Sequence, residues 1–152
     1  MRVAALPGAV LFACNLNRVR SPMAEGLMKR LFGNRVYVDS CGVRSGDDET
    51  PDAFMLAIMD EVGVDLCAHR QKTFEDLEDE SYDAVISLTP EAQHRAVEMA
   101  RSRAVALEYW PTHDPTLILG PRESVLDAYR AVRDALEMRI RERFPTARTF
   151  GG

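Results

Sequence analysis

The chain has 152 residues, a length that predicts one compact domain with a substantial hydrophobic core. Hydrophobic residues make up 46% and charged residues 28% of it, as in ordinary globular proteins. The net charge of −5 argues against nucleic acid or an acidic membrane surface as a partner. No apolar run approaches the roughly 18 residues of a membrane span, and the apolar stretch at the N-terminus breaks at Pro7, too early for a signal peptide.

The first half of the chain alternates strand and helix signals. Residues 9–13 form a short apolar run, typical of a strand that is buried on both faces. Ser21 suits the cap and Pro22 the first turn of a helix, which continues until Gly33. Residues 36–38 predict a second strand. An apolar stripe then predicts a helix over residues 54–62 that ends at Gly63.

The second half repeats this alternation. Residues 84–88 predict a third strand, a helix follows from about Pro90 to Ser102, and residues 104–107 predict a fourth strand. Apolar residues at helical spacing over 125–140 predict a long C-terminal helix that stops before Pro145.

Strands separated by helices imply right-handed crossovers between parallel neighbours. The sequence therefore predicts an α/β fold: a single domain, residues 1–152, with a four-stranded, mostly parallel sheet and helices on both faces. Such sheets bind ligands beyond the carboxyl ends of their strands. The loops that follow the four predicted strands are thus the places to look for a site.

The loop after the first strand carries a cysteine and an arginine. Cys14 leaves that strand, and Arg20 and Ser21 follow where the helix begins. A turn that enters a helix N-terminus aims backbone N–H groups inward, which suits a tetrahedral dianion, and the Arg20 fork can bind two of its oxygens. The same positive field favours a thiolate, the form that attacks, and Ser21 can hydrogen-bond the sulfur. The sequence predicts Cys14 as a nucleophile, although a buried cysteine at a strand end is often only a core residue.

The segment from Cys14 to Glu25 resembles the phosphate loop and first helix of the low-molecular-weight protein tyrosine phosphatases, whose relatives include arsenate reductases of the same fold. Residues 38–43, residues 59–66 with His69 and Arg70, and Asp114-Pro115 also match that family. The resemblance covers nearly the whole chain beyond a short N-terminal extension, residues 1–8.

The resemblance implies a role for each matching residue. Cys14, Arg20 and Asp114 would be catalytic, with Asp114 as the general acid whose backbone Pro115 restricts. Network residues Asn17, Ser21, Ser40 and His69 would support the loop, although Ser40 can also be a routine turn residue and His69 a surface histidine. The phosphate-binding loop would comprise Asn15, Leu16, Asn17, Arg18, Val19, Arg20 and Ser21.

Several residues depart from the family pattern. Leu16 replaces the usual glycine, Arg18 replaces a small or apolar residue, and Val19 replaces a second cysteine that protects some relatives through a disulfide. Thr116 and Leu117 stand where aromatic residues often flank a phenol ring, and residues 45–49 are acidic rather than aromatic. Phosphotyrosine would therefore lack its usual stacking surface.

The resemblance implies a cysteine-dependent phosphomonoesterase for aryl phosphates or phosphotyrosine, which acts through a phosphocysteine intermediate. Its partner would be a phosphorylated protein or a small phosphate or arsenate oxyanion, and we expect no nucleic acid or membrane partner. Three scattered cysteines without a Cys-x-x-Cys pair argue against a disulfide framework or zinc site. We expect a reduced, cytoplasmic protein with no metal and no cofactor.

The alternative is an arsenate reductase, which Tyr109-Trp110 and residues 129–134 resemble at least as closely. Reductases coupled to thioredoxin need two more cysteines on or after the third strand, where Thr89 and Ala96 stand. Cys41 and Cys67 lie elsewhere, and we expect both to be buried structural thiols. A reductase that uses an external thiol remains open. A non-catalytic phosphate or phosphoprotein binder is a third possibility, against which the presence of both Cys14 and Asp114 argues.

Overall fold

The structure, a computed structural model, describes residues 6–78, 81–101 and 103–145. These residues form an α/β fold with one sheet, as the sequence predicts. The strands are β1 (Ala9–Cys14), β2 (Tyr37–Gly42), β3 (Ala84–Ser87) and β4 (Ala106–Tyr109). The α-helices are α1 (Arg20–Phe32), α2 (Ala53–Asp60), α3 (Pro90–Met99) and α4 (Arg122–Arg143). Three short 3₁₀ helices, η1 (Gly33–Arg35), η2 (Phe74–Asp76) and η3 (Pro115–Leu117), complete the described elements.

The sheet is parallel throughout, in the order β2-β1-β3-β4. The most apolar strand, β1, has a neighbouring strand on each side, and every residue from Val10 to Cys14 is buried. Parallel pairing brings all four carboxyl ends to one edge, where Cys14 pairs with Gly42 and Ser87 pairs with Tyr109. The loops that carry the candidate site residues therefore leave from the same edge.

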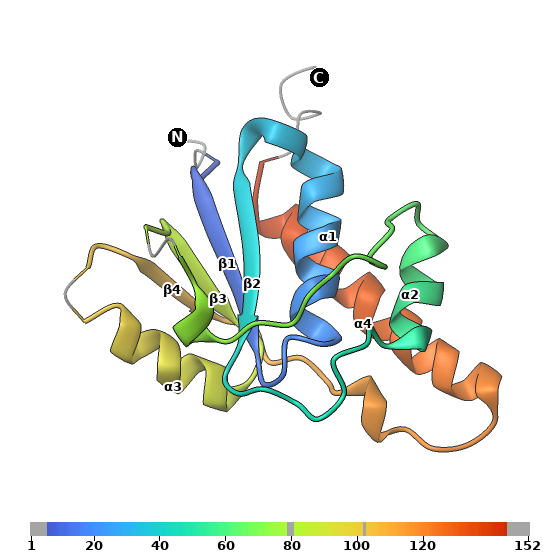
Figure 1. Cartoon of the computed structure of the whole chain (residues 1–152). Helices are drawn as coiled ribbons and strands as arrows, with labels where there is room; N and C mark the ends of the chain where they lie inside the picture. Colours follow the sequence, from blue (N-terminus) through green and yellow to red (C-terminus); the bar gives the residue numbers. More distant parts are fainter. Residues whose placement is uncertain (1–5, 79–80, 102, 146–152) are drawn as a thin grey trace.

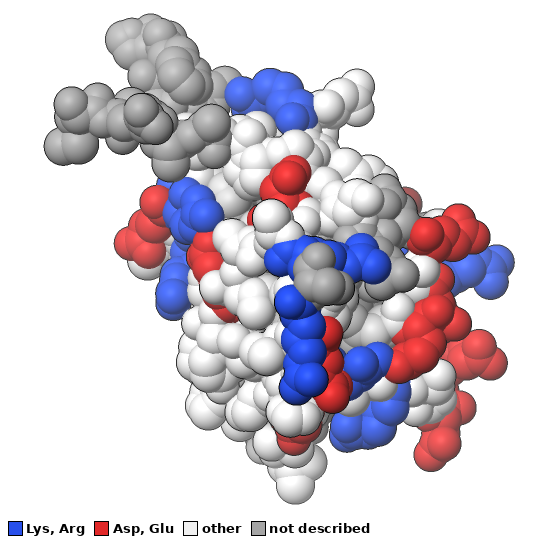
Figure 2. Space-filling view, turned by 90° about the vertical axis from the view of Figure 1, so that its left-hand side faces the viewer, with Lys and Arg blue, Asp and Glu red and all other residues white. Residues whose placement is uncertain are grey.

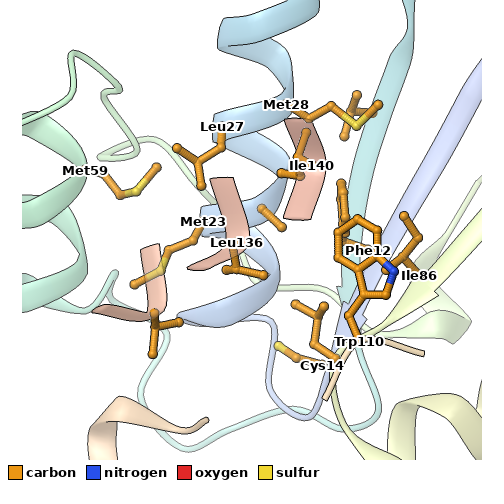
Figure 3. Packing of buried hydrophobic residues seen from close by; sticks show 14 of the residues in the cluster. Phe12, Cys14, Met23, Leu27, Met28, Met59, Ile86, Trp110, Leu136 and Ile140 are labelled. Carbon is orange, nitrogen blue, oxygen red and sulfur yellow. The ribbon is translucent and has the colours of Figure 1, made fainter. Parts of the chain in front are cut away.

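Helices cover both faces of the sheet, with α1, α2 and α4 on one face and α3 on the other (Figure 1). Alternate residues of β1 enter the two cores: Phe12 packs under α1 and α4, whereas Leu11 and Ala13 face α3. Figure 3 shows the larger core, in which Leu27 of α1 and Ile140 of α4 converge toward Phe12. Burial on both faces explains why β1 reads as a continuous apolar run.

The first and third strands differ from their predicted ranges by one residue at the carboxyl end, and the second and fourth differ by more. The second strand continues from Tyr37 to Gly42, beyond the predicted residue 38, because its polar residues are buried with partners. The carboxylate of Asp39 accepts hydrogen bonds from the Tyr82 hydroxyl (3.1 Å) and pairs with Lys72 (2.6 Å). The fourth strand is Ala106–Tyr109, two residues later than predicted, because Trp110 N–H continues the ladder by donating to Ser87.

The helices also correct the predicted ends. Val19, not Ser21, occupies the cap position of α1, and Ser21 lies buried inside the first turn. The helix predicted up to Gly63 ends at Asp60, and Gly63 follows in a turn with a positive φ of 78°. The third helix ends at Met99, and the predicted end at Ser102 lies outside the described residues. The long C-terminal helix was predicted correctly.

Surface charge and hydropathy match the composition. On the face in Figure 2, basic side chains are interspersed with acidic ones rather than gathered in one patch. Within the described residues, no helix has the length and apolarity that crossing a membrane requires. The proposed extension, residues 1–8, lies mostly outside the described chain.

Glu61 ties α2 to α4. Its carboxylate accepts hydrogen bonds from Arg130 (2.7 Å) and Arg133 (2.8 Å), and Arg133 also donates to the Ile58 carbonyl of α2 (2.7 Å). The Arg130 and Arg133 guanidinium groups lower the pKa of Glu61 from 4.5 to about 2. A carboxyl with a lowered pKa in the folded state stabilises the fold above its unfolded pKa and loses that contribution as the pH falls through the folded value.

We therefore predict that Glu61→Gln lowers the melting temperature at about pH 7, and that the difference from wild type shrinks between about pH 4.5 and pH 2. Circular dichroism melts across this range measure it. Glu137→Gln is the matched control, because the partner of Glu137 among the described residues is Arg141 of the same helix. A difference that stays constant down to about pH 2 would show that the ion pairs do not cause it.

Candidate active site

The loop between β1 and α1 folds into a cradle around the Cys14 sulfur. Cys14 ends β1 and is 2% exposed, and α1 begins six residues later at Arg20. The turn depends on Asn17, whose φ is 58° and whose side chain is fully buried. Asparagine enters this left-handed conformation more readily than other non-glycine residues, because its short amide bonds nearby groups.

The Asn17 amide organises the polar groups around the sulfur. Its nitrogen donates to the hydroxyls of both Ser21 and Ser40 (2.9 Å each). Ser21 Oγ lies 3.0 Å from Cys14 Sγ, and Ser40 donates to Glu25 (2.5 Å). Ser21 accepts from Asn17, so its own proton can be donated, and the two acceptors within reach are the Cys14 sulfur (3.0 Å) and the more distant Cys41 carbonyl (3.4 Å). The network predicted for Asn17, Ser21 and Ser40 thus has the required contacts.

Residues 69–72, far from Asn17 in the sequence, contact both its backbone and its side chain. His69 Nε2 lies 2.8 Å from the Asn17 carbonyl oxygen, and the Lys72 N–H donates to Asn17 Oδ1 (3.0 Å). Lys72 is anchored in turn, because Gly42 N–H donates to its carbonyl (2.8 Å). The structure thus places His69 in contact with the loop. Lys72 was not among the predicted site residues, because its contribution is a backbone group.

Gly42 was also not among the predicted site residues. Because Gly42 has no side chain, the loop between β1 and α1 can pack directly against the end of β2. A Cβ at Gly42 would lie 2.8 Å from backbone atoms of Asn15, Leu16 and Asn17. The adjacent Val43 N–H donates to the carbonyl of Asn15 (2.8 Å). The end of β2 is therefore the floor on which the cradle rests.

Arg18 binds an acidic segment between β2 and α2, residues 45–50, which we call the entrance loop. Its guanidinium donates to the Thr50 carbonyl (3.1 Å) and to Asp48 (3.1 Å), and it lies 3.8 Å from Asp52. Asp52 is buried, caps α2 by accepting from Met55 N–H (3.0 Å), and accepts from the Tyr129 hydroxyl (2.9 Å). Arg18 thus links the cradle to α2 and α4. This explains why a basic residue can stand at a position where relatives are small or apolar.

Arg20 and Asp114 meet on the opposite side of the cradle. Arg20 donates to the Thr112 carbonyl (3.0 Å), and its guanidinium lies 3.7 Å from the Asp114 carboxylate. Asp114 Oδ1 accepts from both the N–H (3.0 Å) and the hydroxyl (2.6 Å) of Thr116, so Oδ2 faces Arg20. We call residues 110–117 the acid loop. This loop brings Asp114 to Arg20 across 94 residues of sequence.

A cavity of about 630 Å³ opens between the acid loop and the start of α3. Thr89 joins α3 to the cradle, because its hydroxyl donates to Asn15 (2.7 Å) and accepts from Ala92 N–H (3.1 Å). The cavity lining includes Asn15, Arg20, Thr89, Glu91, His113 and Asp114. A phosphorylated group that enters here meets the arginine and the carboxylate together.

Comparison with known proteins identifies the family of the chain. The model of the low molecular weight phosphotyrosine protein phosphatase family matches residues 9–148. The chain belongs to this family. The glutaredoxin arsenate reductase of Synechocystis is 32% identical over 131 residues, which cover 86% of this chain and 92% of that protein. The protein-arginine-phosphatase of Geobacillus stearothermophilus is 27% identical over 138 residues, 89% of this chain and 93% of its own.

A solved arsenate reductase in its phosphate-binding state superposes with a TM-score of 0.67. It shares 30% identity over 89% of this chain and 95% of its own. The family therefore contains both phosphatases and arsenate reductases close to this chain, as the resemblance implied.

The other two cysteines, Cys41 and Cys67, differ in their exposure. Cys41 is fully buried on the face of the sheet opposite Cys14, and burial raises the pKa of its thiol. The prediction that Cys67 is buried was wrong: it is exposed, and a hydrogen bond to the Asp65 carboxylate raises its pKa. Cys67 follows the turn at Gly63 and lies at the surface. The apolar residues near it in the sequence did not indicate this exposure. Among the described residues, no group of three or more His, Cys, Asp or Glu side chains is placed to hold a metal ion.

We predict that Gly42→Ala disrupts the cradle, because its Cβ would overlap backbone atoms that cannot rotate away. Overpacking of this kind costs about 1–3 kcal/mol, so kcat/KM for an aryl phosphate should fall at least about tenfold. Gly46→Ala is the control, because its Cβ would meet only side-chain atoms, of Leu16 at 3.5 Å and of Gln71 at 3.8 Å, which are ordinary contact distances. Equal kinetics for the two variants would contradict the close packing of β2 against the loop.

We predict that Cys14 is the fastest of the three cysteines to react with iodoacetate at about pH 6, where ordinary thiols are almost fully protonated. Inorganic phosphate should slow this reaction alone. Mass spectrometry after brief treatment identifies the labelled residue. Cys67 is a built-in control, since it is exposed but lies next to a carboxylate. Faster labelling of Cys67 than of Cys14 would refute an activated nucleophile.

Proposed function

We propose that the protein is a cysteine-dependent phosphomonoesterase that hydrolyses aryl phosphates through a phosphocysteine intermediate. One observation carries the proposal: Arg20, which follows Cys14 in the same loop, lies 3.7 Å from Asp114 and lines one cavity with it. The Cys14 sulfur lies 3.0 Å from the hydroxyl of Ser21, the residue next to Arg20. Binding phosphate alone requires neither a nucleophile nor an acid.

In the first step, the Cys14 thiolate attacks phosphorus in line with the ester oxygen. The S–P bond forms as the P–O bond to the alcohol breaks, and Asp114 delivers its proton to the leaving oxygen. Backbone N–H groups at the start of α1 and the Arg20 fork face the charge on the transferred oxygens. Arg20 lies 3.7 Å from Asp114, a distance longer than a hydrogen bond, and would turn from it toward a bound phosphoryl group.

In the second step, water attacks the phosphocysteine, and Asp114, now a carboxylate, takes a proton from it. The S–P bond breaks and inorganic phosphate forms. Cys14 leaves as a thiolate, which the Ser21 hydroxyl stabilises by donating its proton in a hydrogen bond across 3.0 Å. The chain Asn17 to Ser21 to Cys14 thus supports both the attacking and the leaving sulfur.

The substrate we propose is a phosphorylated protein, in particular a phosphotyrosine, or a small aryl phosphate. The acidic entrance loop and the mixed surface charge give no support for nucleic acid as a partner. The three free cysteines fit a reducing compartment such as the cytoplasm, which would keep Cys14 as a thiol.

The second candidate is arsenate reduction, favoured by the 32% identity to an arsenate reductase. Here the Cys14 thiolate would attack arsenate as water leaves. An external thiol would then attack the Cys14 sulfur, so that the S–As electron pair passes to arsenic and arsenite departs. A second external thiol would free Cys14 and form a disulfide. External thiols are required because Thr89 caps α3, Ala96 is buried and Cys41 faces away.

The test compares turnover of an aryl phosphate without thiol and reduction of arsenate with glutathione and glutaredoxin. We expect the phosphatase reaction to run without any thiol, since water completes that cycle. Negligible phosphate release together with thiol-dependent arsenite formation would replace the first candidate with the second.

We predict that Asp114→Asn slows hydrolysis of esters with poor leaving groups about 10²–10⁴-fold and of esters with good ones far less, because only the former need protonation. A series of substituted phenyl phosphates measures the dependence. Asp60→Asn, an exposed aspartate at the end of α2, is the control. An equal loss for all leaving groups would place the acid elsewhere.

Arg20→Lys should reduce kcat/KM at least about 100-fold, on the order of 3 kcal/mol, because an ammonium cannot bind two oxygens in one plane. The same assays measure it, with circular dichroism to verify the fold. Near-normal kinetics would mean that Arg20 serves only to hold the acid loop through Thr112.

A further inference from the structure

A second cavity, of about 400 Å³, lies behind the acid loop, between that loop and α4. Its lining is almost entirely apolar. Trp110 and Leu136, both labelled in Figure 3, lie on its inner side, and Leu117 and Ile118 form part of the outer wall. Cavities of about 300–1,000 Å³ with apolar walls and a few polar groups are typical of small-molecule sites.

The helix α4 creates this hollow. Three alanines, Ala128, Ala131 and Ala135, recur at helical spacing and face the acid loop. Their small side chains leave the space unfilled beside Val132 and Leu136, which are buried in the core. The gap is therefore part of the regular packing of α4 against the loop and not an end effect.

Arg139 places a positive charge at this cavity. Its guanidinium lies 5.1 Å from the centre of the Trp110 ring and lines the cavity. No carboxylate in the described part of the chain forms an ion pair with Arg139, whereas Arg130, Arg133, Arg141 and Arg143 on the same helix all have acidic partners. The other charged residue of the lining, Asp114, already has partners in Arg20 and Thr116. A largely apolar hollow whose cation has no carboxylate partner is complementary to a molecule with an apolar body and one anionic end.

We propose that this cavity binds a small amphipathic organic acid and that this binding is linked to occupancy of the phosphate cradle. The volume of the cavity lies in the range of small-molecule sites. The link arises because Pro111, Thr112, His113 and Asp114 line both cavities, so the acid loop is their common wall. Thr112 accepts the Arg20 hydrogen bond on one side of this wall, and Pro115 is buried on the other.

Trp110 reports directly on the site, because it is the only tryptophan in the chain. Octanoate and adamantane carboxylate, which do not fluoresce, are titrated while Trp110 emission is followed, and isothermal titration calorimetry gives an independent Kd. Octanol and adamantane methanol are the neutral partners. We expect the acids to bind at least about threefold more tightly than the alcohols, as a partly exposed charge pair allows.

Three variants test the position. Ala131→Leu should abolish binding by filling the cavity, and it should fold because Ala131 is exposed on α4. Arg139→Gln should remove the preference for acids over alcohols. Arg141→Gln is the matched control, since Arg141 belongs to the same helix but pairs with Glu137 outside the cavity lining. It should leave the Kd unchanged.

The linkage is measured as the Kd of the acid with and without saturating inorganic phosphate at constant ionic strength. We expect a change of at least about fivefold, and the acid should change the Kd of phosphate by the same factor. This part rests on the proposed function only in that the cradle binds phosphate. The Trp110 titration needs no turnover, so it remains informative if the protein hydrolyses nothing.

Several results would overturn the proposal. Absence of binding, equal binding of acids and alcohols, or unchanged binding in Ala131→Leu would each reject the site or its ligand class. An acid Kd that is the same with and without bound phosphate would reject the linkage. Trp110 emission that depends on protein concentration without any acid would instead assign the cavity to a second copy of the chain.

Discussion

The left-handed backbone of Asn17 is the constraint on which the candidate site depends. Among the described residues it is the only non-glycine with positive φ, a conformation that costs about 1–2 kcal/mol. The surrounding structure compensates by satisfying every polar group of the side chain: Lys72 donates to its oxygen, and Ser21 and Ser40 accept from its nitrogen. The left-handed turn at Asn17 therefore depends on these partners.

Those partners come from three separate parts of the chain. Ser21 belongs to α1, Ser40 to β2, and Lys72 to a segment that runs alongside the end of β2. The parallel pairing of β1 with β2 brings them together, since it places Gly42 directly beside Cys14. The candidate site thus depends on the strand order. If β1 had another neighbour than β2, Asn17 would lack its hydrogen bond to Ser40 and the loop would lack the surface at Gly42 on which it rests.

Electrostatic balance around the cradle follows from the same arrangement. Arg18 is occupied by the entrance loop and Asp52, and Arg20 by the acid loop. Arg18 therefore connects the cradle to the entrance loop and to the start of α2, and Arg20 connects it to the acid loop. The acid loop has a second neighbour in α4, whose alanine face leaves the cavity near Trp110. A change in the packing of α4 against the acid loop would therefore alter the position of Asp114, which belongs to that loop.

The sequence by itself determined the alternation of strands and helices, the parallel sheet and the identity of the loop after β1. These rest on local signals: apolar runs, helical spacing and the glycines and prolines at the ends. It also placed Asn17, Ser21, Ser40 and His69 near the cradle, but only because the family resemblance supplied their roles. Their residue types alone fit ordinary turns and surfaces.

Only the tertiary structure decided which groups meet. Gly42 and the Lys72 N–H contribute backbone, which carries no side-chain signature, so no pattern in the sequence marks them. Cys67 was expected to be buried and is exposed, because the direction of the chain after the Gly63 turn fixes its environment. Asp114 reaches Arg20, and Arg139 reaches Trp110, through contacts between segments that are distant in sequence or lie in different elements. Local propensity fixes elements, whereas distances between side chains depend on how those elements pack.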